Sequence, residues 1–184
     1  TYKKLDDKNM FSIWERREKM DHILVLYRSK YGATKRYAEL LKEKLACDIL
    51  DARSFQKDMA ARYECFIFAG AIYASGISGM DVLRKNYPYI RDKKIAVLCV
   101  GASPYDDKAI EDVRKNNLKE LSGKIPLFYA RGAWDESRMT FKDRTLCKLL
   151  QKMINGKDPN ICEPWMKALL AASGKKCDWV DEKY

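Results

Sequence analysis

Strand-like apolar runs alternate with helix-like segments along most of this chain, and that alternation constrains the fold more than any other feature. The strand-like runs are 22–28, 47–52, 65–71, 94–102 and the beginning of 124–134. The segments with helical spacing between them are 34–46, 78–90 and 107–121, and the helix at 78–90 is expected to end near Pro88. Strands that are apolar on both faces and alternate with amphipathic helices are typical of a parallel sheet with helices on both sides.

The sequence therefore predicts an α/β fold of three layers, built on a five-stranded parallel sheet. Right-handed crossovers leave few ways to connect such strands, and five of them suit the doubly wound order 2-1-3-4-5. Ligands of these sheets bind at the carboxyl ends of the strands, near the point where the strand order reverses. Three loops are expected at that edge, at residues 29–34, 70–79 and 101–107.

Several segments lie outside this repeating pattern. Two extra C-terminal helices are expected, a basic amphipathic one at 137–157 and another at 159–176. A third helix start, at Asp178, stops after barely two turns and is interpreted as truncated. Residues 1–20 are interpreted as an N-terminal extension of a domain at 21–184. The extension is either an amphipathic arm for a partner or membrane surface, or an incidental addition.

Residue counts exclude several classes of function. His22 is the only histidine, and the six cysteines form no CxxC pair, which argues against a zinc site and against Ser–His or Cys–His catalysis. Cysteines inside strand-like runs indicate a reducing, cytoplasmic setting, and no apolar run approaches the ~20 residues of a membrane span. The net charge of +10 fits a solvated basic surface or one that attracts an anionic partner. No nucleic-acid recognition motif accompanies that charge, so nucleic-acid binding is not expected.

The loop SKYGAT at 29–34 has the chemistry of a phosphate-binding loop. It precedes a helix whose first amide groups and dipole attract anions. Gly32 allows close approach of the backbone, Ser29 and Thr34 supply hydroxyl donors, and Lys30 supplies positive charge. Thr34 could alternatively serve only as the helix N-cap. Because neither GxxxxGK[ST] nor GxGxxG is present, the pattern favours a terminal monophosphate.

The other two loops have features of a site for a flat ligand. The loop at 70–79 is rich in glycine and carries Tyr73, and the loop at 101–107 carries Gly101 and Tyr105. Glycines permit close approach of the backbone to a planar group, and two tyrosines at one sheet edge could enclose an aromatic ring system. Either tyrosine alone is equally consistent with an ordinary surface position.

These three loops resemble those of the flavodoxin superfamily. The phosphate loop of that family usually reads hydroxyl-x-hydroxyl-Gly-x-Thr, to which SKYGAT is similar except that Tyr31 stands where the family has a short hydroxyl residue. The resemblance covers roughly residues 20–135. Within the superfamily, the chain is most similar to flavodoxin-domain proteins like the menaquinone-dependent protoporphyrinogen oxidase, through ILVLYRSKYGAT, the GAIY loop, the basic helix FKDRTLCKLLQKM and a late DW.

The resemblance implies a flavodoxin-like sandwich that binds FMN non-covalently. Ser29, Lys30, Tyr31, Gly32, Ala33 and Thr34 would hold the phosphate. Ala71, Ile72, Tyr73, Ala74, Ser75 and Gly76 would line one face of the flavin ring and its N5 edge, with Tyr73 stacking and the Ala74–Gly76 backbone able to reorient with the redox state. Gly101, Ala102, Ser103 and Tyr105 would hold the other face and the pyrimidine edge. No catalytic side chain and no metal ligand is assigned, because the flavin carries the chemistry.

The function expected from this resemblance is electron transfer through FMN. The protein would serve as a carrier that docks with redox partner proteins, or as a protoporphyrinogen or quinone oxidoreductase with an anionic or quinone substrate. Peripheral membrane contact through the basic helices belongs to the same expectation. A third alternative, of another class, is a module of flavodoxin fold that has lost FMN and acts by protein interaction.

Overall fold

The computed structural model describes residues 22–73 and 75–184. The predicted extension at 1–20 and the site residue Ala74 therefore lie outside the described residues.

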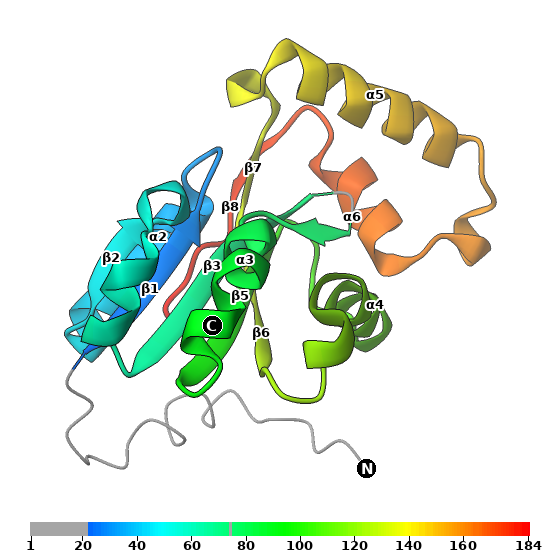
Figure 1. Cartoon of the computed structure of the whole chain (residues 1–184). Helices are drawn as coiled ribbons and strands as arrows, with labels where there is room; N and C mark the ends of the chain where they lie inside the picture. Colours follow the sequence, from blue (N-terminus) through cyan, green and yellow to red (C-terminus); the bar gives the residue numbers. More distant parts are fainter. Residues whose placement is uncertain (1–21, 74) are drawn as a thin grey trace.

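Five parallel strands form the central sheet, in the order β2-β1-β3-β5-β6 (Figure 1). Their bounds are β1 Ile23–Arg28, β2 Asp48–Asp51, β3 Cys65–Tyr73, β5 Lys94–Gly101 and β6 Leu127–Arg131. The short strand β4, Gly76–Ile77, adds antiparallel to the end of β3 and stands outside this order. The predicted order 2-1-3-4-5 of five main strands is therefore confirmed.

Helices cover both faces of the sheet. Helix α2 (Ala33–Leu45) packs on one face, and α3 (Met80–Ile90) and α4 (Asp107–Leu118) pack on the other (Figure 1). Strand β1 contributes to both layers, because Val25 is buried in the cluster of α2 whereas Leu24 is buried in the cluster of α3 and α4. Successive strand residues point to opposite faces, so a strand between two helical layers must be apolar throughout.

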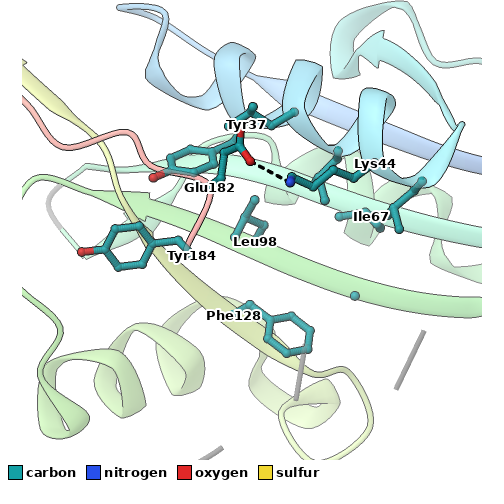
Figure 2. Close-up of a pocket in the computed structure, with 11 residues that line it drawn as sticks. Tyr37, Lys44, Ile67, Leu98, Phe128, Glu182 and Tyr184 are labelled. Carbon is teal, nitrogen blue, oxygen red and sulfur yellow. Dashed lines mark hydrogen bonds and ion pairs between the residues drawn. The ribbon is translucent and has the colours of Figure 1, made fainter. Parts of the chain in front are cut away.

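The end of the chain lies on the α2 face. Val180 and Tyr184 pack against the hydrophobic cluster that α2 forms with the sheet. An apolar hollow lies beside them, with Leu98 and Tyr184 in its lining (Figure 2). Lys44 of α2 and Glu182 also line this hollow and form an ion pair of 2.7 Å. Helix α2 and the chain end together cover this side of the sheet.

Over the described residues 52–64, short turns and no α-helix connect β2 to β3. The polar stretch between β2 and β3 forms two 3-10 turns, η1 (Ala52–Ser54) and η2 (Lys57–Arg62). Helix α3 ends at Ile90, where the predicted range 78–90 also ends, two residues after Pro88. Pro88 lies in the last turn, where its missing N–H removes a single helical hydrogen bond, and Ile90 is fully buried in the core. Burial of Ile90 therefore extends the helix past the proline.

The two predicted C-terminal helices are present. They are α5 (Phe141–Asn155) and α6 (Pro164–Ala172), and the remaining 3-10 turns are η3 (Lys119–Leu121), η4 (Glu136–Arg138) and η5 (Pro159–Ile161). Helix α5 lies beyond the edge of the sheet, away from the two helical layers (Figure 1). Over residues 22–73 and 75–184, no helix is both long and apolar enough to cross a bilayer.

The sequence did not predict the two-stranded ribbon of β7 (Ala133–Asp135) and β8 (Lys176–Asp178). The helix expected from Asp178 is wrong, because Asp178 ends β8 instead. Its carboxylate forms an ion pair of 2.6 Å with Arg36 and accepts a hydrogen bond from the Val180 amide at 3.1 Å. These contacts hold the residues after β8 as a turn against α2.

Candidate functional site

The three candidate loops meet at one edge of the sheet, as predicted. Arg28 at the end of β1 is paired with Gly70 in β3, and Ala71 of β3 is paired with Val100 in β5. The loops that follow these parallel strands therefore leave the sheet side by side.

The first loop presents the uncapped N-terminus of α2. Gly32 is the N-cap residue, with a φ of 101° and no side-chain cap. The helix begins at Ala33, so the alternative in which Thr34 is the N-cap is wrong, and Thr34 lies in the first turn with 1% exposure. The Gly32 amide donates to Ser29 Oγ at 3.1 Å, which closes the loop. The free amides of a helix start attract an anion, and a Cβ on Gly32 would meet no atom within 4 Å.

The second loop is a tight hairpin that is hydrogen-bonded to a side chain of α4. Tyr73 at the end of β3 pairs with Gly76 in β4, and Ser75 between them has a φ of 66°. Asn117 of α4 accepts a hydrogen bond from the Ile77 amide at 2.7 Å and donates to the Ser75 carbonyl at 2.8 Å. The buried side chain of Asn117 therefore fixes the backbone on both sides of the turn.

The third loop is fixed by two residues of β6. The Tyr129 hydroxyl donates to the Ser103 carbonyl, and Arg131 Nε donates to the Ala102 carbonyl at 3.1 Å. A Cβ on Gly101 would lie 2.9 Å from the Tyr129 ring, so this position requires glycine. Tyr105 is 59% exposed and packs edge-on against the Tyr129 ring at 5.9 Å between centroids.

An aspartate of α5 joins the first two loops. The Asp143 carboxylate accepts hydrogen bonds from Lys30 Nζ at 2.5 Å, from the Tyr31 hydroxyl, and from the Tyr73 hydroxyl at 3.1 Å. Tyr31 also accepts a hydrogen bond from the Thr140 amide at 3.2 Å, just before α5 begins. The start of α5 is thereby attached to both loops.

The contacts of Asp143 change the pKa values of the groups involved. Hydrogen bonds from Lys30 and Tyr31 lower the pKa of Asp143 to about 2, in spite of its burial. The same hydrogen bond raises the pKa of Lys30 above its usual value. Burial, and then the hydrogen bond to Asp143, raise the pKa of Tyr73. At neutral pH the cluster therefore holds the ionised carboxylate of Asp143, the ammonium of Lys30 and the neutral phenol of Tyr73.

The structure brings some of the predicted residues together and leaves others apart. Tyr73 is drawn to the first loop through Asp143, while Tyr105 contacts Tyr129 and Asp107. The two tyrosines thus contact different partners, and their enclosing a ring between them stays a prediction. Ala71 and Ile72 of β3, and Ser75 of the turn, belong to the hairpin. Ala74 lies outside the described residues.

Four residues of the site were missed by sequence reasoning: Asn117, Tyr129, Arg131 and Asp143. A signal existed for Asp143, since it is the single acidic residue in the helix FKDRTLCKLLQKMIN. The other three lie in ordinary helix or strand patterns, where nothing in the sequence distinguishes them from packing residues.

The donors of the first loop suit an anion such as a phosphate group. An uncapped helix start, two nearby hydroxyl side chains and an open position above Gly32 form a neutral cradle for an anion. The exposed Tyr73 and Tyr105 at the same edge are suited to an aromatic ring. Within the described residues, no group of three or more His, Cys, Asp or Glu side chains could hold a metal ion.

The family model described as Flavodoxin domain matches the chain over residues 24–160. No curated protein matches the chain significantly. Similar solved structures include a flavodoxin, WrbA-like protein from Agrobacterium tumefaciens, at 20% identity and a TM-score of 0.47, covering 67% of this chain and 88% of that one. Another is an NAD(P)H:quinone oxidoreductase from Methanothermobacter marburgensis, at 13% identity and a TM-score of 0.42, covering 60% of this chain and 82% of that one.

Proposed function

The chain belongs to the Flavodoxin domain family, and from that premise we propose that it binds FMN and transfers electrons through it. The observation that carries the proposal is the uncapped start of α2 at Gly32, with Ser29 and Thr34 beside it and Tyr73 at the neighbouring loop. Bound FMN supplies the redox chemistry. The protein supplies the position of the ring and its electrostatic surroundings.

The residues of the chain have separate tasks in this proposal. The amides at the start of α2 and the hydroxyls of Ser29 and Thr34 bind the phosphate. The hairpin held by Asn117 presents its backbone to one side of the ring, and the loop held by Tyr129 does so on the other. Asn117 and Tyr129 hold their two loops before any ligand binds, which lowers the cost of ordering those loops. Thr34 is only 1% exposed, so its hydroxyl must be uncovered when the phosphate binds.

The visible absorbance of the purified protein tests the proposal, since bound FMN is yellow. Ser29→Ala and Thr34→Ala should each weaken FMN binding by about tenfold or more, because a hydrogen bond to a charged group contributes about 1.5–3 kcal/mol. Ser122→Ala, just before β6 at the opposite end of the strands, is the matched control and should leave the affinity unchanged. A colourless protein that FMN cannot reconstitute would favour the module without FMN.

The outer face of α5 favours an oxidoreductase over a simple carrier. Phe141 is 83% exposed, Leu149 55% and Met153 60%, and they lie among the exposed Lys142 and Lys148. An apolar stripe bordered by lysines suits an anionic amphipathic substrate or a membrane surface. The second candidate function is therefore a protoporphyrinogen or quinone oxidoreductase, in keeping with the resemblance to the menaquinone-dependent enzyme.

Kinetic measurements separate the two roles. Turnover with protoporphyrinogen and a quinone supports the oxidoreductase. Reduction in two well-separated one-electron steps, without turnover, supports the carrier that docks with protein partners. A reducing, cytoplasmic setting is part of the proposal, because Cys65 and Cys99 are buried in the sheet as free thiols.

A further inference from the structure

Asp143 places a negative charge beside the loop proposed to bind the FMN phosphate. Its side chain is only 5% exposed, and all three side chains that donate to it belong to the two proposed flavin loops. Lys30 is the only cationic side chain in the segment 29–34. The ion pair of 2.5 Å with Asp143 neutralises that charge.

This pairing changes what the first loop offers a phosphate. With Lys30 paired, the remaining donors are backbone amides and hydroxyls, which are neutral. The ion pair as a whole carries no net charge, so Lys30 gives a phosphate little attraction while Asp143 remains ionised. Riboflavin has the same ring and no phosphate, so this pairing does not affect its binding.

We propose that Asp143 is a specificity-determining residue of the flavin site. Its carboxylate keeps Lys30 in an ion pair, so that the ammonium is not available to bind the cofactor phosphate. The preference of the site for FMN over unphosphorylated riboflavin is thereby reduced. The inference rests on the proposed function, since it concerns the same site. Asp143 acts through Lys30 and through its charge, so it is a positioning residue with no part in the redox chemistry.

The test is a comparison of two flavins on two proteins. Dissociation constants of FMN and riboflavin are measured, by quenching of flavin fluorescence, for the wild-type protein and for Asp143→Asn. Asparagine keeps the shape and a hydrogen-bond acceptor while removing the charge. We expect FMN to bind about tenfold more tightly to the variant and riboflavin to change less than about twofold. The difference should shrink as salt is added, because salt screens charge.

Asp92→Asn is the control for net charge, since Asp92 is exposed and precedes β5 at the opposite end of the sheet. It should leave the ratio of the two dissociation constants unchanged. Asp143→Ser removes the same charge with a smaller side chain, and it replaces Asp143→Asn if that variant fails to fold.

The outcomes separate this inference from the proposed function. If both flavins bind but the ratio is unchanged, or moves against FMN, Asp143 is not a specificity determinant, and the flavin site stands. If neither flavin binds any of the proteins, the proposed function and this inference are both wrong.

Discussion

The Asn117 side-chain amide donates to the Ser75 carbonyl oxygen at 2.8 Å, and so joins α4 to the hairpin of the second loop. The same side chain accepts from the Ile77 amide at 2.7 Å and donates to the Val113 carbonyl at 2.7 Å. Its exposure is 7%. Water cannot readily replace these bonds, so Asn117 supports the hairpin in addition to the pairing of β3 with β4.

Asn117→Ala should therefore destabilise the protein and weaken flavin binding. The Ile77 amide loses a buried partner, at a cost of about 1–3 kcal/mol in the free energy of unfolding. Urea unfolding measures that loss, and fluorescence titration with FMN measures the binding. Asn116→Ala, at the exposed neighbouring position on the same helix, is the control. Equal stability of the two variants would show that the hairpin holds its shape without Asn117.

Gly70→Ala should distort the same hairpin from the side of β3. A Cβ at this position would lie 2.1 Å from the Ser78 carbonyl oxygen and 2.6 Å from Ile77 Cγ2. Overpacking of this kind costs about 1–3 kcal/mol. At Gly123 a Cβ would meet nothing within 4 Å, so Gly123→Ala should change the free energy of unfolding by less than about 0.5 kcal/mol. Thermal unfolding of both variants checks the contrast, which fails if Gly70→Ala is as stable as Gly123→Ala.

The attachment of α5 to the flavin loops should weaken in acid. The pKa of Asp143 is about 2 in the folded protein, below the value of about 3.9 for an unfolded aspartate. A lowered carboxylate pKa stabilises the folded state above the unfolded pKa, and that stabilisation is lost as the pH falls from about 4 to about 2. Asp143→Asn should lack this component. Amide hydrogen exchange of residues 141–155, followed from pH 5 to pH 2, measures it; parallel profiles for the two proteins would contradict the prediction.

The outer face of α5 should bind anionic vesicles. Replacing Phe141 or Met153 by serine removes an exposed apolar side chain, and burial of such a side chain contributes about 1.5 kcal/mol or more. Co-sedimentation with vesicles containing phosphatidylglycerol should fall by about tenfold per substitution. Tyr89→Ser removes a side chain that is 56% exposed on α3 and should have no effect. If all three variants bind equally, vesicle contact does not use α5.

The sequence could predict the sheet because its signals are local. Each strand is recognisable from an apolar run of a few residues, and the connection rules for parallel strands supply the order of the strands in the sheet. The three loops follow from the same rules, since the carboxyl ends of such strands share an edge. The apolar spacing of α5 was a local signal too.

The links between elements could not be predicted in this way. Asp143 is 113 residues from Lys30 and 112 from Tyr31, and no rule of spacing joins residues so far apart. Tyr31 departs from the family pattern of the phosphate loop, and the structure shows its hydroxyl directed to Asp143. The β7–β8 ribbon was not predicted, because a strand of three residues is too short for its hydrophobic pattern to distinguish it from a loop.

That ribbon has a consequence for the segment that it encloses, residues 136–175. Asp135 is paired with Lys176, so the residues between them leave and return at neighbouring points. A segment with adjacent ends can be inserted into, or removed from, an existing fold without displacing what precedes it. Residues 136–175 thus form a unit with adjacent ends, and the Flavodoxin domain match extends into this unit as far as residue 160. The unit contains both Asp143 and the exposed apolar face of α5, so one closed segment of the chain carries the carboxylate that contacts the first two loops and the face that is open to a partner.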